Sequence, residues 1–183
     1  MARAKGTTFL HDRHYIVAHY GEEGWQRLLT TLTPEDRAVI ASIIAVGWYD
    51  HALQVRLVRA IRVVFEGDEP DIVKSTGRHA AEEDLTRIHR AFLRMANPAF
   101  VLEKAAEYWS RFFDTGKWHV RRVENGAEAI LVGVGIVDEA WCMNITAYVG
   151  RMFELVGAKE PRVTHARCRA RGDAHCEFAV RWK

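Results

Sequence analysis

The chain has 183 residues, 49% of them hydrophobic, so it is long enough to bury one sizeable core in a single domain. Its 26 basic and 24 acidic side chains leave a formal charge of +2, which does not indicate nucleic acid or an anionic membrane as a partner. The N-terminus lacks the apolar run of a signal peptide, and no window is apolar enough to cross a membrane. Three cysteines do not form a secreted disulfide framework, so we expect a cytoplasmic protein with free thiols.

The first part of the chain, from about residue 8 to 115, predicts helices. Thr33 followed by Pro34 marks a helix start, because threonine caps the backbone and proline suits the first helical position. Asn97-Pro98 marks a later start. The helix after "VGWYDH" carries an apolar stripe at helical spacing: Leu53, Leu57, Ile61 and Val64. Its basic stripe is interpreted as a solvated face rather than a phosphate site: Arg56, Arg59 and Arg62.

The second part, about residues 116–183, predicts a β-hairpin, a helix and a second β-hairpin. Asn125-Gly126 is a strong hairpin signal because both residues accept positive φ, and a turn there places Trp118 opposite Gly133. Asp138 caps the helix, which ends before Gly157. We therefore predict an α+β domain in which N-terminal helices pack with an antiparallel sheet built from the two hairpins.

The second hairpin, "THARCRARGDAHCEFAVRW", carries two cysteines beside its turn. With Gly172 at the centre of the turn, Cys168 lies opposite Cys176, and Arg167 forms a favourable ion pair with Glu177 on the other face. Both thiols then point toward the core. Directly opposed Cβ atoms lie roughly 4.5–5.5 Å apart, a separation that permits metal chelation, a strained disulfide or simple packing.

These residues, together with the helix that contains Cys142, resemble the 4-vinyl reductase domain, a small-molecule-binding module of bacterial regulators. The stretches "GWYDHALQVRLVRAI" and "NPAFVLEKAAEYW" also make the whole chain similar to a family of myxobacterial paralogues. The resemblance implies the ligand-binding fold shared with nitric-oxide-sensing haem domains and a family of Golgi-trafficking subunits. It implies no enzymatic activity.

The resemblance also implies a metal site, because related aromatic-sensing domains hold a structural zinc with three cysteines and a glutamate. The matching cysteines are Cys142, Cys168 and Cys176, and the glutamate position is His165, whose imidazole is also a zinc ligand. On a regular strand His165 and Cys168 face opposite sides, so both reach one ion only if a bulge or a strand end intervenes. Zinc and buried free thiols both remain open, and a cytoplasmic disulfide is not expected.

The large aromatic side chains must either complete the core or line a cavity. Most of them are interpreted as core. The resemblance implies that four of them face a shared ligand pocket: Trp109, Phe112, Trp118 and Trp141.

Other candidate chemistry is weaker. "GVGIVDEA" lacks the third glycine of a dinucleotide fingerprint, and its neighbouring strands indicate an antiparallel hairpin. We interpret His11, His14 and His19 as surface histidines and find no residue set for catalysis. We expect no haem, because haem-sensing relatives bind iron through a histidine within a motif that we do not find here.

We therefore expect a non-enzymatic, homodimeric sensory domain that binds an apolar or aromatic small molecule and acts through a partner protein. Two alternatives remain open: a protein-interaction scaffold with no ligand, and a tetrapyrrole-handling accessory factor.

Overall fold

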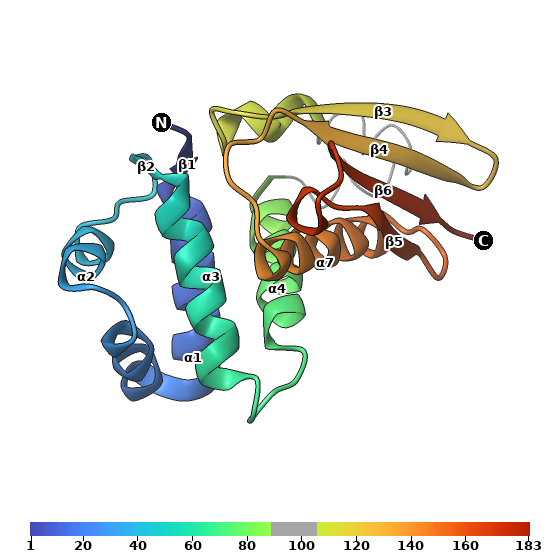
Figure 1. Cartoon of the computed structure of the whole chain (residues 1–183). Coiled ribbons are helices and arrows are strands. Elements are labelled where there is room, and N and C mark those ends of the chain that lie inside the picture. The colour runs from blue at the N-terminus through green and yellow to red at the C-terminus, as the bar shows by residue number, and fades with distance from the viewer. Residues whose placement is uncertain (89–105) are drawn as a thin grey trace.

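The computed structural model describes residues 1–88 and 106–183, and the helix start expected at Asn97-Pro98 lies outside them. The N-terminal half is helical, and two short strands, β1 and β2, pair antiparallel beside the helices. Its elements are β1 (Arg3–Lys5), α1 (Gly6–Thr30), α2 (Pro34–Ala41), β2 (Trp48–Asp50), α3 (His51–Phe65) and α4 (Ile72–Ile88). Figure 1 shows these helices gathered on one side of the molecule. None of the described helices is long and apolar enough to span a bilayer.

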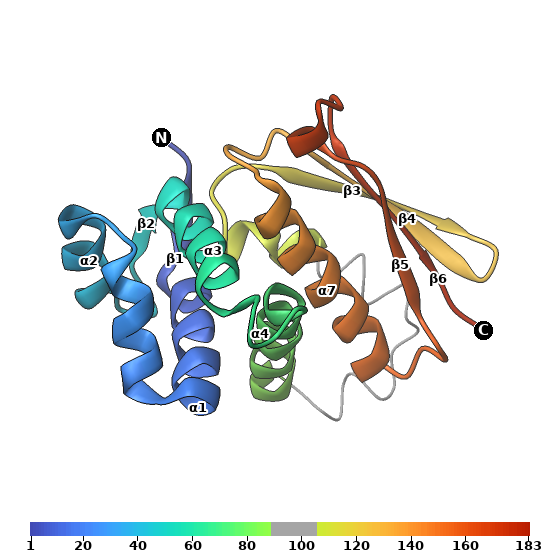
Figure 2. The ribbon, with the colours of Figure 1, turned by 60° about the horizontal axis from the view of Figure 1, so that its bottom comes forward.

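The C-terminal half is an antiparallel sheet with one long helix. Its strands follow the order β3-β4-β6-β5, and α7 lies between the sheet and α4 (Figures 1 and 2). The elements are η1 (Trp109–Arg111), β3 (Lys117–Val123), β4 (Gly126–Val132), α7 (Glu139–Leu155), β5 (Arg162–Arg167), η2 (Arg169–Arg171) and β6 (Cys176–Arg181). The predicted α+β class, with N-terminal helices and an antiparallel sheet, is confirmed.

The helix starts follow the local signals in the sequence. The Thr33 side chain accepts a hydrogen bond from the Asp36 amide at 3.2 Å and begins α2. Asp138 accepts from the Trp141 amide at 2.8 Å and begins α7. α1 contains a sharp kink at Gly21, where φ is 69°, so its second arm turns back beside the first.

The basic stripe of α3 forms ion pairs rather than a free cationic surface. Arg56 binds Asp36 at the start of α2, with nitrogen to oxygen distances of 2.7 and 2.8 Å. Arg59 binds Asp138, the cap of α7, at 2.8 Å. The stripe therefore connects α3 with its neighbours in both halves of the chain.

The hairpin registers differ in detail from the prediction. In the first hairpin Trp118 pairs with Leu131, not Gly133, because the turn residues are Glu124 and Asn125 rather than Asn125 and Gly126. The two-residue shift leaves the facing of each side chain unchanged.

In the second hairpin Arg167 pairs with Glu177 as predicted, but a β-bulge between His165 and Arg167 shifts the rest of β5 by one residue. His165 therefore pairs with Phe178, where a regular strand would have placed Ala166. Because a one-residue shift exchanges the two faces of a strand, His165 turns toward the core side of the sheet.

Candidate metal centre and the aromatic cluster beside it

Four side chains from three elements converge beneath the sheet. Cys142 lies in the first turns of α7, His165 in β5, Cys168 directly after β5, and Cys176 at the start of β6. One ligand atom from each residue can be chosen so that all four lie within 4.8 Å of one another. All three cysteines are buried free thiols. The structure thus brings together the four residues that the resemblance implies for a metal site.

The bulge is the reason that His165 takes part. Without it, His165 and Cys168 would face opposite sides of the sheet. With it, the His165 ring lies against the core-facing Phe178 ring, with centroids 4.3 Å apart and planes 5° apart. The condition stated from the sequence, a bulge or a strand end, is therefore met.

The turn between the two hairpin cysteines holds the first of them in place. The Cys168 amide donates to the Asp173 carboxylate at 2.7 Å, and the Arg171 amide donates to the Cys168 carbonyl at 2.9 Å. Gly172 sits in the left-handed region at a φ of 96°, which glycine adopts at low cost. The "ARGD" turn thus presents Cys168 and Cys176 from backbone that is fixed by its own hydrogen bonds.

The donor set suits zinc. The Sγ atoms of Cys142 and Cys168 are 3.6 Å apart. Tetrahedral zinc with sulfur bonds of about 2.3 Å needs sulfur atoms roughly 3.8 Å apart, so this pair needs little adjustment. The buried Nε2 of His165 has no hydrogen-bond partner. A buried imidazole nitrogen without a hydrogen-bond partner, beside clustered thiols, is a donor set that a metal ion would satisfy.

The thiols share their protons unequally. A hydrogen bond from Cys142, with a further contribution from His165, lowers the pKa of Cys176 to about 4. The same contact with Cys176, together with burial, raises the pKa of Cys142. The lowered pKa of Cys176 favours the thiolate, which is the form of cysteine that binds metal.

Three of the four aromatic residues implied as a pocket lie in one cluster. The Trp109 ring centroid lies 5.7 Å from Trp118 and 6.4 Å from Trp141. Phe113, rather than the expected Phe112, takes the buried place: its ring stacks on Trp109 at 4.3 Å and meets Trp141 at 5.8 Å. Phe112 itself is partly buried against the core.

His51 also belongs to this cluster, and sequence analysis missed it. Its side chain is 0% exposed, and its ring lies 5.1 Å from both Phe113 and Trp141. Burial lowers the pKa of His51 to about 4, and neither ring nitrogen has a hydrogen-bond partner. The indole nitrogens nearby are satisfied, Trp141 by Gln54 at 3.1 Å and Trp109 by the Thr115 carbonyl at 2.9 Å. No spacing in the sequence singled out His51.

The metal centre and the aromatic cluster adjoin one another. Cys142 directly follows Trp141 in α7. On the sheet side His165 stacks on Phe178, whose ring lies 5.2 Å from Trp118. The four candidate ligands and the aromatic cluster are therefore neighbours on both the α7 side and the sheet side.

The N-terminal histidines are not all on the surface. His14 is exposed, as expected, but His11 is 3% exposed and lies 3.5 Å from Glu83 of α4. His14 and His79 meet the same carboxylate at 3.1 and 3.3 Å. The packing of α4 on α1 buries His11, and no local pattern in α1 could show that.

No family model and no curated protein matches this chain. Among solved structures it is similar to an H-NOX protein from S. oneidensis in the Fe(II)NO ligation state, with a TM-score of 0.73 and 15% identity over 98% of this chain and 99% of the other. It is also similar to the Fe(II) unliganded H-NOX protein from K. algicida, with a TM-score of 0.66 and 12% identity over 98% of this chain and 96% of the other. For the IWP-051-bound H-NOX from Shewanella woodyi the TM-score is 0.64 and the identity is 15%, over 97% of this chain and 94% of the other. At these identities the likeness shows the fold.

The comparison corrects one prediction. We expected no haem because no histidine motif for iron was found, yet the chain shares its fold with H-NOX proteins whose structures are in Fe(II) states. That expectation is wrong, because a fold can be kept at 12% identity while the local motif around a ligand changes beyond recognition. The ligand-binding fold implied by the resemblance is supported, whereas membership of the 4-vinyl reductase group stays a prediction.

Proposed function

We propose that this chain is a non-enzymatic sensory domain that binds a small molecule and signals through a dimer interface or a partner protein. The observation that carries the proposal is the agreement in fold over 98% of the chain with H-NOX proteins studied in Fe(II)NO and Fe(II)CO ligation states. The ligand region would be the aromatic cluster, which lies between the sheet and the helices. A ligand would act by binding one of two conformations more tightly than the other.

The metal centre would hold one zinc ion through Cys142, His165, Cys168 and Cys176. Its role would be structural, because four protein ligands leave no open position for a reacting water. Zinc there would tie α7 to both strands of the second hairpin and so fix one wall of the aromatic cluster. Buried free thiols are the competing account of the same residues.

Haem is a candidate ligand. Among the described histidines, His51 combines full burial with two ring nitrogens that lack hydrogen-bond partners, and its low pKa keeps the imidazole neutral. A neutral imidazole can bind haem iron, so His51 is the described residue that would hold it. Bound haem would supply an iron that takes a diatomic gas.

Native mass spectrometry of the untagged protein, purified without added metal, tests both proposals. We expect one zinc per chain in the wild type and in the control His175→Ala, whose imidazole lies on the same hairpin outside the four ligands. His165→Ala should bind zinc at least about tenfold more weakly. A bare chain mass in the wild type would reject the zinc centre.

The same spectra and a haemin titration address the ligand. A retained organic mass, or a haem absorption band that is lost in His51→Leu, supports the sensory function. A haem band that His51→Leu keeps unchanged would place the iron on another residue. Porphyrin bound without coordinated iron would favour the tetrapyrrole-handling alternative. A protein that binds neither haem nor a retained ligand would favour the scaffold.

A further inference from the structure

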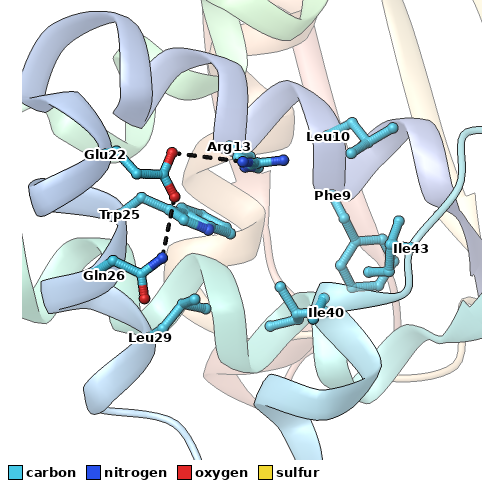
Figure 3. A pocket seen from close by; sticks show the side chains of 10 residues that line it. Phe9, Leu10, Arg13, Glu22, Trp25, Gln26, Leu29, Ile40 and Ile43 are labelled. Carbon is cyan, nitrogen blue, oxygen red and sulfur yellow. Dashed lines mark hydrogen bonds and ion pairs between the residues drawn. The ribbon is translucent and has the colours of Figure 1, made fainter.

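A cavity of about 240 Å³ lies in the helical half, away from the metal centre and the aromatic cluster. It opens between the two arms of α1 and the segment at α2 (Figure 3). The kink at Gly21 creates it by turning the second arm of α1 back, which brings Trp25 and Leu29 opposite Phe9. Ile40 and Ile43 close the remaining side.

Most of this wall is apolar, but one end is polar. Arg13, Glu22 and Gln26 line the cavity together there (Figure 3). Glu22 accepts from Gln26 at 3.1 Å and meets the Arg13 guanidinium at 3.5 Å. The second distance exceeds the 2.7–3.2 Å of a good N–H to oxygen hydrogen bond, so Arg13 and Glu22 form a weak pair.

Arg13 is the cation best placed to receive a ligand at this end. Its side chain is 47% exposed, and its guanidinium carbon lies 5.9 Å from the Trp25 ring. A guanidinium offers five donors in a planar fork that matches a carboxylate, so an incoming carboxylate would bind better than the single long contact to Glu22. An amine would instead have to displace both Arg13 and Gln26 from Glu22.

The loop that follows α2 exposes two apolar side chains that do not line the cavity. Ile44 is 59% exposed and Val46 is 72% exposed, directly after the cavity residue Ile43. The cavity exceeds the roughly 150 Å³ of an engineered cavity that binds benzene. A short alkyl or monocyclic body therefore fits inside.

We propose that this cavity binds a small monocarboxylate, with the carboxylate on Arg13 and the apolar body against Phe9, Leu29 and Ile40. The site goes beyond the sensory function proposed above and does not depend on it, because it shares no residue with the metal centre or the aromatic cluster. The two arms of α1 would both contact the ligand, so its binding would hold the kink in place.

The test compares octanoate with 1-octanol and octylamine, which share the chain but differ in the head group. The reporter is the indole resonance of Trp25 in ¹H–¹⁵N spectra of the full chain, assigned with Trp25→Phe. We expect a saturable shift of this resonance with octanoate, at a Kd at least about tenfold below that of either other probe. Equal affinity for octanol, or no saturable shift with octanoate, would overturn the proposal.

Three variants separate the ion pair from a general charge effect. Arg13→Gln should remove the preference for octanoate over octanol, and Arg13→Lys should keep most of it. Arg27→Gln is the matched control, since Arg27 lies on the second arm of α1, pairs with Asp68 at 3.4 Å and does not line the cavity. If Arg27→Gln lowers the affinity for octanoate as much as Arg13→Gln does, octanoate does not bind at the proposed site. The outcome is independent of zinc and haem, because His165→Ala should leave this titration unchanged.

Discussion

Two sets of buried ionisable groups, one in each half of the molecule, differ in their surroundings. In the sheet half, His165 and the three cysteines are buried together, so each donor atom has others within 4.8 Å. In the helical half, Asp12 and His51 are buried without a hydrogen-bond partner for Asp12 Oδ2 or for either His51 nitrogen. The first arrangement forms a site that a metal ion could complete. The second carries an unfavourable free energy that only neutral protonation states reduce.

The largest expected effect is at the metal centre. Cys168→Ser combined with Cys176→Ser should lower the free energy of unfolding by about 3–5 kcal/mol if zinc is structural, because metal binding then contributes directly to folding. Thermal unfolding measures this. A chelator should lower the Tm of the wild type toward that of the double variant and leave the variant unchanged. Only a modest fall in Tm, without a chelator effect, would show that the thiols merely pack.

A smaller effect, an increase in the free energy of unfolding, is expected when Asp12 is replaced. Burial raises its pKa from 3.8 to about 8, so the folded state holds a proton that the unfolded state releases. The Asp12 contribution to stability is therefore present below pH 4 and is lost as the pH rises toward 8. Asp12→Asn, which is neutral at every pH, should increase the free energy of unfolding at pH 8 by about 1–3 kcal/mol. Denaturant unfolding of the wild type and the variant at pH 5 and pH 8 measures this difference. An equal increase in the free energy of unfolding at both pH values would contradict a raised pKa of Asp12.

The smallest change in the free energy of unfolding is expected when His51 is replaced. The contribution of His51 to stability falls as the pH falls, opposite to that of Asp12. Its pKa falls from 6.5 to about 4 on burial, so the unfolded state binds a proton more readily between these values. The wild type should therefore lose stability as the pH falls from 6.5 to 4. His51→Leu removes two unpartnered nitrogens and should increase the free energy of unfolding by about 1 kcal/mol at pH 7, and more at pH 5. A destabilised variant would mean that the imidazole has a partner in solution, as a ligand would provide.

Much of the fold could be predicted because it depends on short-range chemistry. The Thr33 and Asp138 caps, the glycine after α7 and the pairing of Arg167 with Glu177 are all interactions between residues close in sequence or directly across a turn. The three cysteines could be assigned to one site because the hairpin pattern places two of them on the core face and the family resemblance adds the third. These features need no knowledge of what packs against them.

The remaining features depend on contacts between distant segments. Phe113 replaces Phe112 in the aromatic cluster because the helical turn η1 ends beside it, and a one-residue difference there decides which ring faces Trp141. His11 is buried because α4, which follows much later in the chain, packs over α1. His51 packs against Phe113, which follows η1, and against Trp141 of α7, and neither residue is near it in sequence.

The sequence by itself determined the α+β class, the helix starts at Thr33 and Asp138, and the pairing of Arg167 with Glu177, because periodicity, capping and pairing across a turn act within a few residues. Only the tertiary structure decided that β5 has a bulge between His165 and Arg167. A bulge has no reliable local signal. Here it brings His165 to the same face as Cys168 while Arg167 stays opposite Glu177. That single extra residue turns two cysteines and a distant third into a site with four donors.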